Sequence, residues 1–273
     1  MSQPVQSDSV SVAWGDTRGD LQLRLCVRTT TQDMALCVAT LLEERCAQAV
    51  AERGVFTLAL SGGRTPLELF RLLRSAAWQE RINWPKTQVF WADERCVAPE
   101  SASSNAGVAL RELFAHVPVG KVFRMQGEAI PAQAAAAYEA DLRAAHCAGA
   151  SFAAAGSGAS DVPPASVPRL DCVLLGMGAD GHTASLFPGG GLLDETARLV
   201  ATGLAPTRES RLTLTLPVLN AARCCLFTVS GAEKRAVLAA CLDLTAQPHL
   251  PAQRVRPWDG ELIWVVGHDA LQA

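Results

Sequence analysis

The residues best suited to chemistry lie between positions 176 and 188, where an apolar run ends in a glycine-rich segment. Gly176, Gly178 and Gly181 bracket Asp180 and His182. Histidine is the side chain whose ordinary pKa, about 6.5, suits proton transfer near neutral pH. The glycines leave open space around the imidazole, and a nearby carboxylate can fix its tautomer. We therefore expect His182 to be a catalytic base that Asp180 orients.

A second glycine-rich turn, Ser61-Gly62-Gly63-Arg64-Thr65-Pro66, follows the apolar run 55–60. Two glycines permit close backbone approach, and the Thr-Pro pair is typical of a helix start. The N–H groups and the positive dipole end of such a helix can bind an anion. Taken alone, the segment fits an ordinary strand-to-helix turn equally well, and it matches neither a Walker loop nor a dinucleotide fingerprint.

Further charged side chains follow other predicted strands. Asp93-Glu94-Arg95 comes directly after the apolar stretch 88–91, and Asn105 opens the next helix. These acids and the arginine could form a solvated turn, but a guanidinium there suits a phosphate or a developing oxyanion. Arg211 precedes an alternating segment, and Lys234 lies in a predicted first helical turn. The positive end of the helix dipole disfavours a cation in that turn. A lysine at this position therefore indicates that an anion binds beside it.

Alternating strands and helices must position these groups. Buried strands are predicted at 55–60, 88–91, 171–175, 224–229 and 262–266, with a half-solvated strand at 21–27 and an alternating segment at 212–216. Helices are predicted between Thr30 and Gly54 and at 67–75, 105–114, 131–146 and 232–242. This pattern favours an α/β fold, with a mainly parallel sheet covered by helices on both faces. The carboxyl ends of its strands would gather the candidate residues at one edge.

Composition narrows the class of protein. The net charge of −3 gives no electrostatic case for nucleic acid or an anionic membrane, and no segment approaches the roughly 20 apolar residues of a membrane span. The nine cysteines are odd in number and form no C-x-x-C pair, so we expect reduced core thiols. The N-terminus lacks a secretory pattern, so we expect a cytoplasmic enzyme. The Ala/Gly/Ser/Pro-rich stretch 148–168 is expected to be a flexible insertion within a single domain.

Taken together, these motifs resemble the 6-phosphogluconolactonase family from roughly residue 21 to residue 266. The matching segments are Ser61–Pro66, Asp93–Arg95, Ser104-Asn105, Gly176–Pro188, Arg211–Pro217 and Gly231–Lys234. Two positions depart from the family pattern. Arg64 stands where a small hydroxyl residue is usual, and Ala106 stands where an aromatic residue is common.

The resemblance implies one Rossmann-like domain over residues 1–273 that hydrolyses 6-phospho-D-glucono-1,5-lactone in the pentose phosphate pathway, without metal or cofactor. It implies a catalytic role for His182, with Asp180 beside it. It also implies anion-handling roles for Arg95, Arg211 and Lys234, and a sugar-phosphate cradle formed by Ser61, Gly62, Gly63, Arg64 and Thr65. We add Asp93, Asn105 and Gly178 as substrate-binding residues. The expected partner is a small sugar-phosphate lactone, and the expected state is a monomer or weak homodimer without nucleic acid or membrane.

Two alternatives remain open. The glucosamine-6-phosphate deaminase/isomerase family is similar in fold but shows Asp-Glu-Tyr and Ala-Phe-Asn-Glu-Pro runs. This sequence has Asp93-Glu94-Arg95 and Ala184–Pro188 instead, and so lacks a second acid beside the histidine. A non-catalytic sugar-phosphate-binding regulator would carry a basic helix-turn-helix, for which the first twenty residues are too few and not basic.

Overall fold

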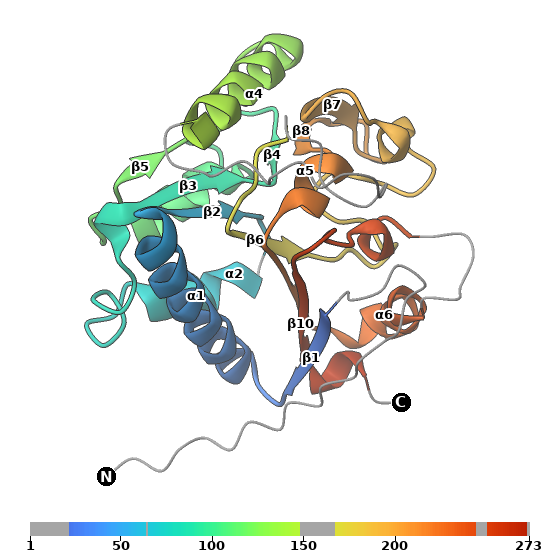
Figure 1. Ribbon diagram of the computed structural model, residues 1–273. Coiled ribbons are helices and arrows are strands. Elements are labelled where there is room, and N and C mark those ends of the chain that lie inside the picture. The colour runs from blue at the N-terminus through green and yellow to red at the C-terminus, as the bar shows by residue number, and fades with distance from the viewer. Residues whose placement is uncertain (1–21, 64, 148–166, 244–249, 272–273) are drawn as a thin grey trace.

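A seven-stranded sheet forms the centre of the protein, of which the computed structural model describes residues 22–63, 65–147, 167–243 and 250–271 (Figure 1). All neighbouring strands in this sheet are parallel. The strands in order across the sheet are β1 (Gln22–Arg28), β10 (Glu261–Gly267), β9 (Cys224–Val229), β6 (Cys172–Gly176), β2 (Phe56–Leu60), β3 (Thr87–Trp91) and β5 (Lys121–Val122). The fold class predicted from the sequence is confirmed.

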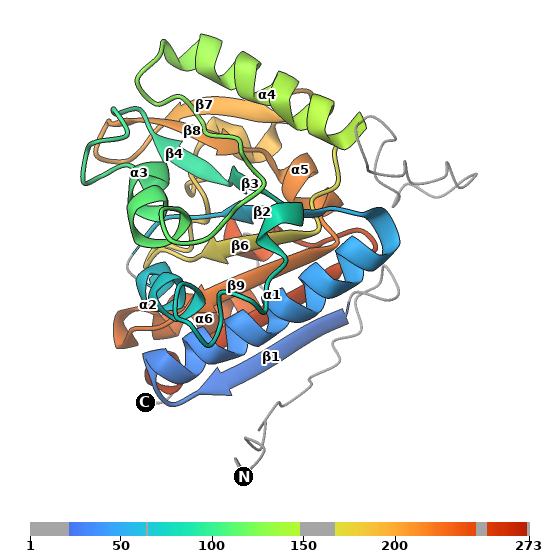
Figure 2. The same cartoon turned by 90° about the vertical axis from the view of Figure 1, so that its left-hand side faces the viewer.

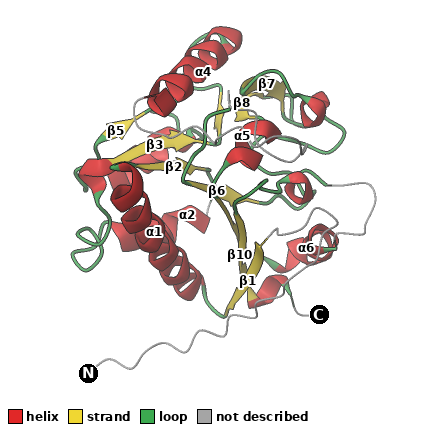
Figure 3. Ribbon diagram, in the orientation of Figure 1, coloured by secondary structure: helices red, strands yellow, loops and turns green. Residues whose placement is uncertain are grey.

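Helices cover both faces of the sheet, as Figure 3 shows in red against yellow strands. They are α1 (Thr31–Arg53), α2 (Thr65–Leu73), α3 (Asn105–Ala109), α4 (Pro131–Cys147), α5 (Leu216–Ala221) and α6 (Arg235–Leu242). One face packs its apolar core against α1, α2 and α3. The other packs against α4, α5, α6 and a small second sheet (Figure 2).

The helix ends follow the capping rules that the sequence indicated. Thr30 caps α1, since its side chain accepts a hydrogen bond from the Asp33 amide, and Gly54 closes the helix at φ 75°. Ser104 caps α3 in the same way, by accepting from the amide of Gly107. The helix predicted over 105–114 is α-helical only to Ala109, and a π-helical turn, Leu110–Phe114, completes it.

A three-stranded antiparallel sheet was not predicted as a unit. It consists of β4 (Asp93–Arg95), β8 (Ser210–Leu214) and β7 (Val200–Leu204). Residues 212–214 of the predicted alternating segment 212–216 lie in β8, whereas Leu216 already begins α5. The segments that form β4 and β7 had no recognisable strand pattern. In this sheet Arg95 lies directly opposite Arg211.

Strand register brings the candidate loops together. Leu60 pairs with Trp91 across β2 and β3, and Gly176 pairs with Thr228 across β6 and β9. These four strands are adjacent and parallel, so the loops that follow them leave the same edge of the sheet. The predicted insertion 148–168 lies outside the described residues except for Val167 and Pro168, and Val167 is buried.

Candidate active site

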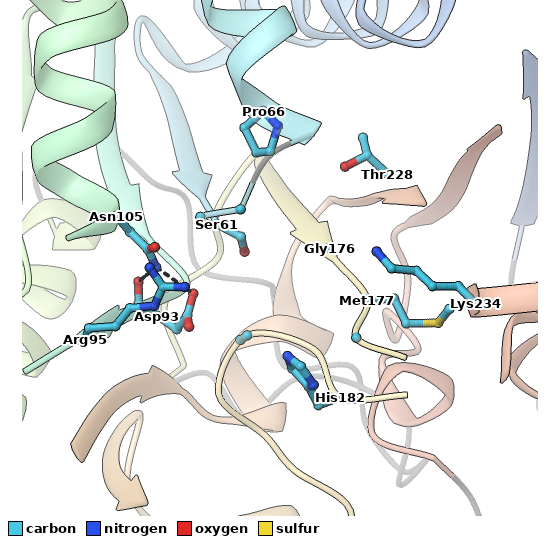
Figure 4. Close-up of a pocket in the computed structure, with 14 residues that line it drawn as sticks. Ser61, Pro66, Asp93, Arg95, Asn105, Gly176, Met177, His182, Thr228 and Lys234 are labelled. Carbon is cyan, nitrogen blue, oxygen red and sulfur yellow. Dashed lines mark hydrogen bonds between the residues drawn. The ribbon is translucent and has the colours of Figure 1, made fainter. Parts of the chain in front are cut away.

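The four loops enclose a pocket of about 190 Å³ at the carboxyl edge of the sheet (Figure 4). Nine of the residues predicted from the sequence line it: Ser61, Gly62, Gly63, Asp93, Arg95, Asn105, Gly178, His182 and Lys234. They come from positions spread over more than 170 residues of the chain. Their convergence follows from the parallel order β9-β6-β2-β3.

Two predicted site residues, Arg211 and Asp180, lie outside the pocket. Arg211 lines a neighbouring groove, where its guanidinium lies 2.7 Å from the Glu209 carboxylate. The strand register explains this position, because Arg211 is held on β8 opposite Arg95, which lines both spaces. Asp180 touches His182 but does not line the pocket. Arg64 lies outside the described residues, and Thr65 is the first residue of α2.

His182 and Asp180 form a close pair. The Asp180 Oδ1 atom lies 2.5 Å from the imidazole Nδ1 and also accepts a hydrogen bond from the His182 amide at 3.1 Å. A carboxylate can only accept, so the proton of the neutral ring resides on Nδ1 and Nε2 keeps its lone pair. Burial raises the pKa of Asp180, but these hydrogen bonds outweigh burial and hold it below its ordinary value. The pair therefore presents a basic nitrogen beside the pocket.

The loop around His182 is tightly wound. The Gly178 amide donates to the His182 carbonyl at 2.9 Å, and the Thr183 hydroxyl donates to the Gly176 carbonyl at 2.8 Å. Ala184 adopts φ 48°, which is unusual for a residue with a side chain. Strained backbone of this kind collects at functional sites. These hydrogen bonds and this backbone conformation fix the position of the His182 imidazole.

Gly178→Ala tests this positioning. A Cβ at residue 178 would lie 2.1 Å from the imidazole Nδ1 and 2.6 Å from the Asp180 carboxylate, so one of these groups would have to move. Because displacing a reacting group by about 1 Å can cost about 100-fold, we expect the kcat of a reaction in which His182 is the base to fall by about that factor. Gly191→Ala is the control, since a Cβ there would touch nothing within 4 Å. An unchanged kcat in Gly178→Ala would show that the fixed ring position is unimportant.

Asp93 faces the same pocket and is buried. Its carboxylate accepts hydrogen bonds from Ser185 Oγ at 2.8 Å and from Asn105 Nδ2 at 3.2 Å. Burial raises its pKa, while the Ser185 hydrogen bond and the positive charges of Arg95 and Arg211 act in the opposite direction. The Ser185 contact joins the His182 loop to β4, across 92 positions of sequence.

Glu94 points away from the pocket and organises its wall. Its carboxylate accepts from the amides of Arg95, Asn105 and Ala106, and from the Ser104 hydroxyl, at 2.7–3.0 Å. A carboxylate at the start of a helix satisfies N–H groups that would otherwise lack partners. Glu94 thereby fixes α3 against β4, and it is a structural residue.

Lys234 approaches the pocket from the opposite side. It ends the 3₁₀ turn Ala232–Lys234 and stands at the N-cap position of α6, so the sequence placed it correctly at a helix start. Figure 4 shows its side chain across the pocket from Asp93 and Asn105, with His182 between the two sides. Lys234 thus supplies a cation on one side of the pocket, and Arg95 supplies one on the other side, beside the oxygen acceptors of Asp93 and Asn105.

Some lining residues were not predicted from the sequence as site residues. Thr228, Met177, Ala184, Gly176 and Pro66 also line the pocket. Thr228 had no distinguishing signal, since it reads as part of an apolar strand. Ser185 carries a contact to Asp93 that its motif did not reveal. Within the described parts of the chain, no three His, Cys, Asp or Glu side chains gather as metal ligands would, and no helix there is long and apolar enough to cross a membrane.

Comparison with known proteins gives consistent matches. Residues 29–264 match the family described as glucosamine-6-phosphate isomerases/6-phosphogluconolactonase. The 6-phosphogluconolactonase of Synechocystis is 37% identical over 86% of this chain and 90% of its own, and that of Nostoc is 36% identical over 80% and 84%. The solved structure of the Trypanosoma brucei 6-phosphogluconolactonase superposes with a TM-score of 0.76 at 28% identity, covering 90% of this chain and 96% of its own.

Proposed function

The chain belongs to the family of glucosamine-6-phosphate isomerases and 6-phosphogluconolactonases, and we propose that it hydrolyses 6-phospho-D-glucono-1,5-lactone to 6-phospho-D-gluconate. The enzyme is a carboxylic ester hydrolase of the pentose phosphate pathway. The observation that carries this function is that His182, paired with Asp180, lines one pocket together with the cations Arg95 and Lys234. The similarity to curated lactonases supports it independently.

In the proposed mechanism, His182 Nε2 takes a proton from a water molecule as that water attacks the lactone carbonyl carbon. Asp180 holds the Nδ1 proton and stabilises the imidazolium that forms. The carbonyl oxygen becomes an oxyanion, which needs donors already in place. Arg95 and the backbone N–H groups of the Ser61–Gly63 loop line the pocket and can supply them. The imidazolium then returns its proton to the ring oxygen as the C–O bond breaks, which yields the open-chain acid.

Lys234 is proposed to hold the substrate phosphate. Lys234→Ala should raise KM about 10- to 100-fold and change kcat less. The ion pair between Lys234 and the remote phosphate stabilises the bound substrate and the transition state equally. Lys86→Ala is the matched control, since Lys86 is an exposed lysine just before β3, at the other end of that strand from the pocket. An unchanged KM in folded Lys234→Ala would place the phosphate elsewhere.

The activity itself is tested by adding the enzyme to freshly generated 6-phosphogluconolactone and following acid release against the spontaneous rate. Unphosphorylated gluconolactone should be hydrolysed with much lower kcat/KM, because it lacks the phosphate anchor. Glucosamine-6-phosphate is supplied in parallel, and ammonia release is recorded. Ammonia release without lactone hydrolysis would assign the protein to the deaminase branch of the family.

We also propose a cytoplasmic location. The eight cysteines whose side chains the structure describes are unpaired thiols, and most of them are buried. Unpaired core cysteines are typical of proteins in reducing compartments.

A further inference from the structure

Two polar atoms beside the Ser61–Gly63 loop have no hydrogen-bond partner. They are Asn105 Oδ1 and Ser61 Oγ, and both side chains are more than nine-tenths buried. Both residues line the pocket, and Gly62 packs against Asn105, since a Cβ at residue 62 would lie 1.7 Å from Asn105 Oδ1. A buried polar atom without a partner destabilises the folded protein, because it has lost its hydrogen bonds to water. Such atoms in a binding pocket indicate groups kept for a ligand.

The orientation of the Asn105 amide is fixed by its neighbours. Its Nδ2 donates to the Asp93 carbonyl at 2.9 Å and to the Asp93 carboxylate at 3.2 Å. Turning the amide over would set Oδ1 against these two acceptors, so the oxygen must point the other way. The group that Asn105 offers to a ligand is therefore an acceptor only.

Because Asn105 Oδ1 can only accept, its partner must be a hydrogen-bond donor, and a fully ionised phosphate group has no donor. A sugar hydroxyl meets the requirement, since it can donate to Asn105 Oδ1 and accept from Ser61 Oγ. Lys234 lies across the pocket, with His182 between (Figure 4). In a phosphorylated six-membered lactone, C2 and C3 lie across the ring from the phosphate-bearing arm, and C2 adjoins the reacting carbonyl. Phosphate at Lys234 and carbonyl at His182 thus direct a C2 or C3 hydroxyl toward Asn105.

We propose that Asn105 Oδ1, flanked by Ser61 Oγ, is a specificity-determining acceptor for the C2 or C3 hydroxyl of the lactone. This inference rests on the proposed function and assigns these two residues to the sugar ring and not to its phosphate. A site built around a hydroxyl rejects an analogue that lacks it, because the polar atoms of the site are then left unpaired.

The test compares kcat/KM for 6-phosphogluconolactone with that for its 2-deoxy and 3-deoxy analogues. The wild type should prefer the parent over one analogue by about 10- to 100-fold. In Asn105→Ala this preference should fall to about threefold or less, because the lost contacts to Asp93 affect all substrates alike and cancel in the ratio. Asn220→Ala is the matched control, since it removes an amide that bonds Arg254 and Arg256 away from the pocket. Its preference should equal that of the wild type.

Ser61→Ala provides a second variant in case Asn105→Ala does not fold, because the Ser61 hydroxyl makes no bond within the protein that its removal could break. It should also reduce the preference, without lowering Tm. A wild type that hydrolyses all three lactones equally, or variants that keep the full wild-type preference, would overturn the inference. A wild type that hydrolyses none would refute the proposed function instead. In that case calorimetry gives the Kd of 6-phosphogluconate and of its 2-deoxy and 3-deoxy forms. The ratio of these Kd values then replaces the kcat/KM preference, and equal Kd values for the wild type would overturn the inference.

Discussion

Replacing His182 with alanine is expected to lower kcat for lactone hydrolysis by about 10²- to 10⁴-fold, the usual value of general-base assistance. The imidazole is the basic group of the pocket, and Asp180 fixes its tautomer because Oδ1 lies 2.5 Å from Nδ1. Substrate binding should largely survive, since Lys234 and the Ser61–Gly63 loop remain. The measurement is kcat and KM from acid release, corrected for spontaneous ring opening.

Two comparisons make the His182 result specific. Glutamine at this position fills space but cannot accept and return a proton, so His182→Gln should be as impaired as His182→Ala. His116→Ala, which removes a histidine outside the pocket, should retain wild-type kcat. Retention of more than about a third of kcat in His182→Ala would mean that the base is elsewhere. Asp93 would then be the next candidate, because Glu94 is committed to the amides of α3.

Replacing Arg95 with alanine is expected to lower kcat by about 10²- to 10³-fold, the typical loss of an oxyanion donor. Arg95 lines the pocket and is anchored by a hydrogen bond to the Ser103 carbonyl at 2.5 Å. Lysine should restore little, because an ammonium lacks the planar fork of the guanidinium.

Arg71→Ala is the control for this variant, since Arg71 is an exposed arginine paired with Glu68 on α2. A rise in KM with unchanged kcat in Arg95→Ala would show that Arg95 binds the substrate uniformly and does not stabilise the oxyanion.

Much of the site could be predicted because parallel strands impose a simple rule. The loops after β2, β3, β6 and β9 each carried a recognisable motif, and their carboxyl ends had to meet once the sheet was parallel. Glycines next to polar residues marked the loops after β2, β6 and β9, as in Gly181 beside His182. The helix caps at Thr30 and Ser104 followed from equally local chemistry.

The remaining features depend on pairing between distant segments. Nothing in the local pattern indicates that β4 pairs antiparallel with β8, and this register places Arg211 in the neighbouring groove. The direction in which Glu94 points depends on where α3 packs. The Ser185 contact to Asp93 likewise forms only when the His182 loop packs against β4. Tertiary packing decides such contacts, and residue type alone does not.

The central claim, that His182 accepts the proton of the attacking water, is tested most directly by kcat/KM as a function of pH for wild type, Asp180→Asn and His182→Gln. The pKa of Asp180 lies below its ordinary value, so this carboxylate stays ionised near neutral pH. Wild-type kcat/KM should fall on acidification, because a protonated imidazole cannot act as a base. In Asp180→Asn the fall should move to lower pH, because the negative charge that favours imidazolium is gone. In His182→Gln the residual rate should show no such fall, whereas an acid limb that persists unchanged in His182→Gln would contradict the mechanism.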